Sequence, residues 1–251
     1  MATYVAMEAP NEMIDNLPEI EFAELRAKSV KDNIDEFVKH IHKIAEEERV
    51  LDCVGLYLLH KHHNDSVNKF LVRNYTENSM QVKLVDKSND IIPASWMLAE
   101  DEEGNNVLLP TEWATDGRAK KQFDKIQNSD FLEKYASALK DAELEEVLGL
   151  TLSWADVMNV DADEILVEQT KFQEGDIFEA NVVTPEKASS FSEDELIETN
   201  WFFGINKSCR CSRVPTYCVS WATYCVRYSP GHASVRRCTR RRLEHRRTCV
   251  G

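Results

Sequence analysis

The run His60-Lys61-His62-His63 carries the side chains best suited to chemistry. It follows an apolar segment directly, and loops at strand ends often hold binding or catalytic groups. In an extended chain His60 and His62 point to one side and His63 to the other. Neutral imidazoles paired in this way are ligands for zinc or copper. The sequence therefore offers His60, His62 and His63 as ligand-binding residues, with a solvated loop and a catalytic role as the alternatives.

A second set of potential metal ligands lies near the C-terminus. Cys211, Cys218, Cys225 and His232 follow one another at intervals of seven residues. Cysteine and histidine in this number can form a tetrahedral zinc centre. Structural zinc modules usually bring their ligands in close pairs, however, and only Cys209 and Cys211 are close here. The candidate metal ligands in this region are Cys209, Cys211, Cys218, Cys225 and His232.

The remaining motifs do not identify a reaction. Asp161, Asp163 and Glu164 resemble part of a calcium loop, but the glycine and the distal glutamate of an EF-hand are missing, which favours a solvated acidic loop. The chain has no phosphate-binding glycine loop, nucleophile elbow, zincin helix or dinucleotide fingerprint. Enzymatic activity stays an open question on this basis, and no cofactor is indicated.

Helices and strands alternate around these residues. Apolar residues at three- and four-residue spacing predict a helix over 29–49, and a second helical stretch covers 115–141 with a break at 128–129. Each is followed by an apolar segment that predicts a buried strand. The expected strands are 50–59, 69–75, 80–86, 94–100, 107–109, 147–154, 164–170 and 176–183. This pattern predicts a single α+β domain with a mostly antiparallel sheet and two main helices.

The two halves of this pattern resemble each other. Val54-Gly55-Leu56-Tyr57-Leu58 precedes Leu71-Val72-Arg73, and Leu148-Gly149-Leu150-Thr151-Leu152 precedes Leu166-Val167-Glu168. A glycine inside a strand often marks a bulge or a close approach of backbone. We interpret the order as a possible duplication of a helix–strand–strand unit, against the alternative of a chance match between short apolar segments. A duplication predicts a pseudo-twofold arrangement with any site at the seam between the halves.

The composition changes abruptly near Lys207. Residues 1–206 hold 19 basic and 43 acidic residues, a net charge of −24, whereas residues 207–251 hold 11 basic residues and one acid, a net charge of +10. We expect a flexible N-terminus over 1–19, an acidic α+β domain over 20–185, an acidic linker over 186–206 and a disordered, basic, Cys- and Arg-rich tail over 207–251. The tail is a zinc module, an arm for nucleic acid or an acidic partner, or the product of a shifted reading frame or retained intron.

Compartment and partners follow from composition. The N-terminus lacks the basic and apolar regions of a signal peptide, and no apolar run reaches the roughly 20 residues of a membrane span, so a cytoplasmic location is expected. Like-charge repulsion keeps nucleic acid from the acidic body and leaves the tail as its only contact. The expected partners are therefore an unknown small molecule or protein, or nucleic acid through the tail.

The segment Val54-Gly55-Leu56-Tyr57-Leu58-Leu59-His60-Lys61-His62-His63 resembles a Gly-Leu-x-Leu-Leu-His-x-His segment of uncharacterised fungal proteins. The resemblance covers residues 54–72 and brings no activity to any residue. The function expected from the sequence is a non-enzymatic binding or accessory protein, in a fungal pathway if the resemblance holds. The alternatives are an enzyme or metal-binding protein that uses His60, His62 and His63, and a protein that binds nucleic acid or an acidic partner through its tail.

Overall fold

The computed structural model describes most of the chain up to Phe203 and two short segments beyond it. The described residues are 3–6, 14, 16–61, 69–76, 79–86, 90–154, 164–172, 178–190, 196–203, 219–226 and 237–241. Their helices are α2 (Ile20–Ser29), α3 (Lys31–Glu47), α4 (Gly117–Gln127), α5 (Phe131–Asp141) and the 3₁₀ turn η1 (Ala188–Ser190). Their strands are β1 (Thr3–Val5), β2 (Val54–Leu58), β3 (Lys69–Tyr75), β4 (Met80–Asp86), β5 (Ile92–Glu100), β6 (Asn106–Ala114), β7 (Leu148–Leu152), β8 (Glu164–Phe172), β9 (Phe178–Lys187), β10 (Leu196–Phe203), β11 (Val219–Val226) and β12 (Arg237–Arg241).

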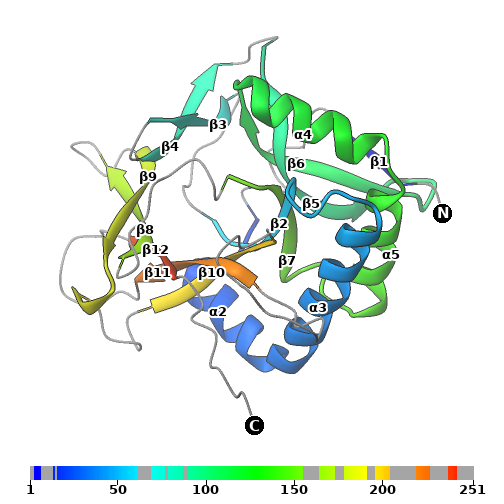
Figure 1. The fold of residues 1–251 in the computed structure, drawn as a ribbon, viewed down its shortest axis with the longest axis horizontal. Helices are drawn as coiled ribbons and strands as arrows, with labels where there is room; N and C mark the ends of the chain where they lie inside the picture. Colours follow the sequence, from blue (N-terminus) through cyan, green and yellow to red (C-terminus); the bar gives the residue numbers. More distant parts are fainter. Residues whose placement is uncertain are drawn as a thin grey trace, which may run out of the picture.

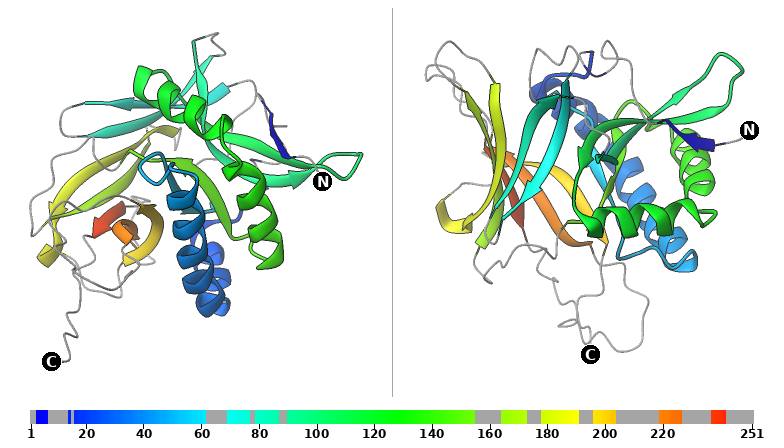
Figure 2. Two further views of the ribbon diagram at one scale, coloured as in Figure 1. Left: turned by 45° about the vertical axis from the view of Figure 1, so that its right-hand side comes forward. Right: turned by 90° about the horizontal axis from the view of Figure 1, so that it is seen from above.

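These strands form one curled sheet, and the helices α3, α4 and α5 lie beside the part of it that contains β2, β5 and β7 (Figures 1 and 2). The strand order is β1-β6-β3-β4-β9-β8-β12-β11-β10-β2-β7-β5, and a further pairing joins β5, the last strand of the series, to β6, the second. Most pairs are antiparallel, with parallel pairs at β1–β6, β3–β6 and β8–β11. The predicted α+β domain with a mostly antiparallel sheet is therefore confirmed. The sequence predicted two main helices, whereas the described residues form four α-helices.

The larger core lies between the helices and the sheet. The apolar stripe of α3, which includes Phe37 and Ile41, packs toward α5, where the Tyr135 ring lies 6.2 Å from that of Phe37. Leu56 and Leu150, at the centres of β2 and β7, are fully buried on the same side of the sheet. The 3.6-residue spacing in the sequence thus identifies the face of α3 that is buried.

A second cluster lies inside the curl of the sheet. It contains Leu71 of β3, Leu166 of β8, Phe202 of β10 and Trp154, which follows β7. Strands that are far apart in the ladder contribute to it, so these side chains meet across the concave side. The Trp154 and Phe202 rings are 4.8 Å apart at 70°, the edge-to-face geometry that aromatic pairs favour.

Both strand glycines allow close packing on this concave side. In the antiparallel β2–β7 pair, Gly55 lies opposite Thr151 and Tyr57 lies opposite Gly149. A Cβ on Gly149 would lie 2.2 Å from the Tyr57 ring, and one on Gly55 would lie 2.5 Å from the ring of Phe202. Both distances are far below van der Waals contact, so each glycine makes room for an aromatic ring.

The chain passes through the same series of elements twice. The first unit, 31–114, runs α3-β2-β3-β4-β5-β6, and the second unit, 131–226, runs α5-β7-β8-β9-β10-β11. Two residues after its last helical residue, each of α3 and α5 is followed by a residue of positive φ, Arg49 (60°) and Glu143 (55°), and these are 94 positions apart. In both, the amide of the next residue donates to the carbonyl five residues earlier, as in a Schellman turn.

The strand registers repeat as well. Strand β5 of the first unit pairs with β7 of the second, and β10 of the second pairs with β2 of the first. Trp96 thereby lies opposite Leu150, and Trp201 lies opposite Leu56, at the centres of the two glycine-containing strands. The parallel β3–β6 pair of the first unit has its counterpart in the parallel β8–β11 pair of the second.

Several predicted boundaries differ from the observed ones. Residues 196–203 of the predicted linker form β10, which pairs with β2 and buries Phe202 and Phe203. Within the predicted flexible N-terminus, residues 3–5 form β1 on the edge of β6. The predicted helix start at Ser29 is wrong, because α2 runs through Ser29 and α3 begins at Lys31. Most of the tail, 207–251, lies outside the described residues, and its described parts are the strands β11 and β12.

Candidate functional site

The most connected polar group of the concave side is the guanidinium of Arg73, on β3. It is 3% exposed, and its Nε donates to Oε2 of Glu112 at 2.7 Å. Its Nη2 forms an ion pair with the same oxygen at 2.5 Å and donates to the hydroxyls of Ser95 and Thr151. These partners come from β6, β5 and β7, so Arg73 joins strands of both units. A buried charge needs this degree of pairing, because an isolated one would be strongly destabilising.

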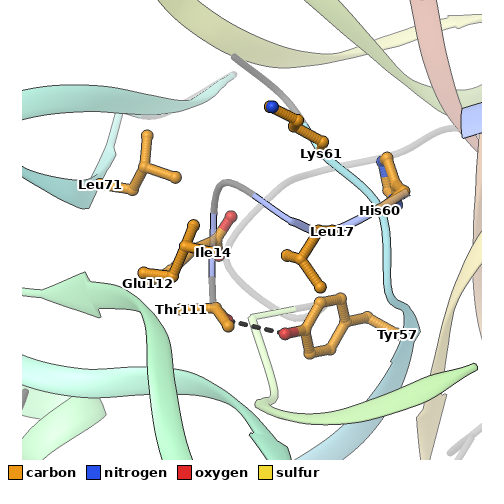
Figure 3. Close-up of a pocket in the computed structure, with 8 residues that line it drawn as sticks. All are labelled: Ile14, Leu17, Tyr57, His60, Lys61, Leu71, Thr111 and Glu112. Carbon is orange, nitrogen blue, oxygen red and sulfur yellow. Dashed lines mark hydrogen bonds between the residues drawn. The ribbon is translucent and has the colours of Figure 1, made fainter. Parts of the chain in front are cut away.

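Glu112 also lines a pocket at the rim of the sheet, which we call the rim pocket. Its volume is about 20 Å³, room for one or two water molecules. Figure 3 shows the residues that line it, which come from β2, β3, β6, the segment after β2 and the segment before α2. They are Ile14, Leu17, Tyr57, His60, Lys61, Leu71, Thr111 and Glu112.

The polar groups of the rim pocket are held by local contacts. The Tyr57 and Thr111 hydroxyls share a hydrogen bond of 2.7 Å, and burial raises the pKa of Tyr57, which keeps the phenol neutral. The amide of Lys61 donates to the carbonyl of Pro18, which fixes the segment before α2 across the pocket. Figure 3 shows Leu17 over the Tyr57 side of this space. An apolar wall with a few convergent polar groups is the usual character of a small-molecule site.

Of the three predicted histidines, only His60 is described. Strand β2 ends at Leu58, so His60 lies beyond the strand, and at 5% exposure it is buried rather than in a solvated loop. Its Nδ1 lies 2.7 Å from the carbonyl oxygen of Leu58, which assigns the proton to Nδ1. His62 and His63 lie outside the described residues. Among the described residues no group of three histidine, cysteine, aspartate or glutamate side chains has metal-binding geometry.

The predicted metal ligands of the tail are not tested by this structure. Cys209, Cys211, Cys218 and His232 lie outside the described residues, and Cys225 is described through its backbone, in β11. The body cysteine, Cys53, is buried, and burial next to Asp52 raises the pKa of its thiol to about 11. A thiol with such a pKa is a poor nucleophile near neutral pH.

A second carboxylate lies buried on the concave side. Glu168 of β8 is 7% exposed, and burial raises its pKa to about 8, with a further increase from Glu112 and a decrease from Arg73. The three side chains come from β3, β6 and β8. At neutral pH Arg73 and Glu112 therefore neutralise each other, and Glu168 is mainly the uncharged acid.

Sequence reasoning missed most of this arrangement. Arg73 ends the segment Leu71-Val72-Arg73, and Glu168 ends the similar segment Leu166-Val167-Glu168. A charged residue at the end of an otherwise apolar strand segment was the one signal in the sequence that could have indicated these two buried groups. Nothing local marks Tyr57, Thr111 or Glu112, because the strand registers alone bring them together. None of the described helices is long and apolar enough to cross a membrane.

The comparisons with known proteins add no assignment. No family model matches the chain, and none of the curated proteins or solved structures matches it either. The function is therefore argued from the geometry of the concave side and the rim pocket.

Proposed function

We propose that this chain is a non-enzymatic small-molecule-binding protein and that the rim pocket is its binding site. The observation that carries the proposal is the convergence of hydroxyl, carboxylate and imidazole groups on one apolar recess. Tyr57, Thr111 and Glu112 supply polar contacts on one side, and Ile14 and Leu17 supply an apolar cover. A small molecule with a hydrogen-bonding end and an apolar end matches this chemistry. The space as it stands holds only one or two water molecules, so such a ligand has to displace side chains that line the pocket in order to bind.

The second unit supports the proposal by contrast. The amide of Leu59 donates to the carbonyl of Val147, and in the same way the amide of Ser153 donates to the carbonyl of Cys53. His60 directly follows Leu59, and Trp154 directly follows Ser153. The two residues therefore occupy equivalent positions in the two units. Trp154 is 2% exposed and packs on Phe202. In the second unit the larger indole of Trp154 fills this position. In the first unit the smaller imidazole of His60 occupies it, and the rim pocket lies beside that ring. Among the described residues, Trp154 thus occupies the place in the second unit that corresponds to the place of His60 beside the rim pocket.

We also propose that the two units arose by duplication of one α-β-β-β-β-β unit. The repeated helix ends, glycine strands and cross-unit pairings support this origin. The Arg73 cluster then lies where the units meet, because Thr151 of the second unit is one of its members. The rim pocket is lined by the first unit and the segment before it, and divergence at positions such as His60 and Trp154 gave the two equivalent places different contents.

The experiment is a ligand screen by NMR with a fragment library, read out on the backbone amides of Lys61 and Thr111. Wild-type protein is compared with His60→Trp, which copies the second unit, and with His40→Trp on the exposed face of α3 as the matched control. Circular dichroism verifies the fold of each variant. We expect fragments to shift both amides in the wild type and in His40→Trp, and to lose that effect in His60→Trp. Saturable binding that His60→Trp leaves unchanged, or no binding to the wild type, would overturn the proposal.

A further inference from the structure

Two cysteines of the C-terminal region are direct partners in the sheet. In the antiparallel β11–β12 pair, Cys225 lies opposite Cys238. The seven-residue spacing that connects Cys225 with Cys211 and Cys218 does not include Cys238, so the spacing along the sequence gives no reason to pair these two. The strand register is the observation that brings them together.

The backbone at this pair has the separation that a disulfide requires. Residues opposite each other in an antiparallel pair share a face of the sheet, with Cα atoms about 4.5–5.5 Å apart. A disulfide joins residues whose Cα atoms are about 4.4–6.8 Å apart, and outside this range the backbone has to move. At Cys225 and Cys238 an S–S bond can therefore form without a change in strand register.

The pair also occupies a position at which a covalent link has consequences for the fold. Strands β12 and β11 lie between β8 and β10 in the strand order, so they connect two strands of the acidic body. Cys225 also lies opposite Ile197 of β10, and Arg237, next to Cys238, lies opposite Gln169 of β8. A bond between the two cysteines closes a loop of 14 residues and restricts the unfolded chain, which favours the folded state.

We propose that Cys225 and Cys238 are a reversible thiol–disulfide pair that fixes the β11–β12 pairing when it is oxidised. This modification site is independent of the rim pocket. In a reducing compartment the pair remains as two thiols, and a low-molecular-weight disulfide such as oxidised glutathione is its oxidant.

The reaction is an exchange of thiols and disulfides. One cysteine thiolate attacks the oxidant, which forms a mixed disulfide and releases one glutathione thiol, and the other cysteine thiolate then displaces the second glutathione. Two thiols of the chain and one S–S bond of the oxidant thus become one S–S bond of the chain and two glutathione thiols. The two cysteine sulfurs lose two electrons in total, and the released glutathione takes up those electrons and the two protons.

The test maps the cysteines of the full chain after incubation with oxidised glutathione. Free thiols are blocked with iodoacetamide, and tryptic peptides are analysed by mass spectrometry without reduction. Trypsin cleaves after Arg227 and Arg237, between the two cysteines, so the bond joins peptide 214–227 to peptide 238–240. The wild type should yield these two peptides as one linked species, which reduction separates.

Substitution by serine identifies the partners. Cys225→Ser and Cys238→Ser should each remove the linked species. Cys218→Ser is the matched control and should keep it, because Cys218 lies in the same tryptic peptide as Cys225. Oxidation in concentrated urea tests the role of the fold. Without the sheet Cys238 pairs with any of the other cysteines, and the share linked to Cys225 should fall at least about threefold.

The bond should also stabilise the folded protein. Oxidation should raise the melting temperature of the wild type by roughly 5–10 °C and leave that of Cys225→Ser unchanged. The proposal fails if both cysteines are alkylated after oxidation, if Cys238 is linked to a different cysteine, or if urea leaves the linkage pattern unchanged. It also fails if the link forms without a rise in melting temperature, because the bond then lies outside the native strand pairing.

Discussion

Replacing Glu168 by glutamine tests the electrostatics of the concave side directly. The folded protein holds the pKa of Glu168 at about 8, against an ordinary value of 4.5 for a glutamate carboxyl. A carboxyl group with a raised pKa binds more protons in the folded than in the unfolded state. Its contribution to stability is therefore complete below the unfolded pKa, and it is lost as the pH rises through the folded pKa.

The magnitude follows from the size of the shift. Each pKa unit corresponds to about 1.4 kcal/mol, so ionisation of Glu168 removes on the order of 5 kcal/mol of unfolding free energy above about pH 8. Native proteins are stable by only about 5–15 kcal/mol, so the effect is large enough to measure. Glutamine keeps the shape and hydrogen-bonding capacity of the uncharged acid but does not ionise. The variant should therefore equal the wild type below about pH 4.5, become progressively more stable than it up to about pH 8, and keep that advantage unchanged at higher pH.

The assay is urea unfolding, followed by tryptophan fluorescence at a series of pH values from about 5 to about 9. Glu133→Gln, on the exposed side of α5, is the matched control for removal of one carboxylate. The difference in unfolding free energy between Glu168→Gln and the wild type should grow up to about pH 8 and then level off, while the difference between Glu133→Gln and the wild type stays nearly constant. Parallel pH profiles for the wild type and Glu168→Gln would refute the reasoning, because they would show that Glu168 is already ionised in the folded protein.

Three further substitutions test the packing and pairing of the sheet, each by thermal and urea unfolding. Gly149→Ala places a Cβ against the Tyr57 ring and should lower the free energy of unfolding by about 1–3 kcal/mol or more. The control Gly117→Ala adds a Cβ in open space and should not lower it. Equal stabilities of the two variants would contradict the close packing at Gly149. Arg73→Met leaves the Glu112 carboxylate without its ion pair and should cost about 3–5 kcal/mol. Tyr135→Phe removes a buried hydroxyl that has no partner among the described residues, so it should be neutral or stabilising by up to about 1 kcal/mol, and a clear loss would reveal a hidden partner.

The elements that local patterns predicted well are those whose signal is complete within a short segment. Helix α3 has a continuous apolar stripe, and the break between α4 and α5 coincides with a polar segment that the sequence shows. Helix α2 was missed because its face is less regular, with Phe22 and Leu25 exposed to solvent. Strand β10 was missed because acidic residues precede it, although Trp201 and the two phenylalanines after it are buried.

The candidate site was less predictable than the fold. His60 was identified because a histidine cluster is visible locally, but its burial depends on Pro18 and the segment before α2, which are distant in sequence. Glu112 and Arg73 are 39 residues apart, and only the register of β3, β5 and β6 brings them together. The change in composition near Lys207 predicts a boundary, yet β11, beyond it, pairs with β10 as β6 pairs with β5.

By itself, the sequence determined the order of the helices and strands from α3 to β9, the buried face of α3 and the similarity of the two glycine-containing strands, because each depends on the spacing of apolar residues along the chain. The tertiary structure alone decided that Gly55 and Gly149 face aromatic rings and that Arg73, Glu112 and Glu168 share one interior. Side chains from strands far apart in sequence acquire a common environment only when pairing and curvature close the sheet. Charge, burial and pKa depend on that environment, so the chemistry of this protein arises from the fold rather than from any local motif.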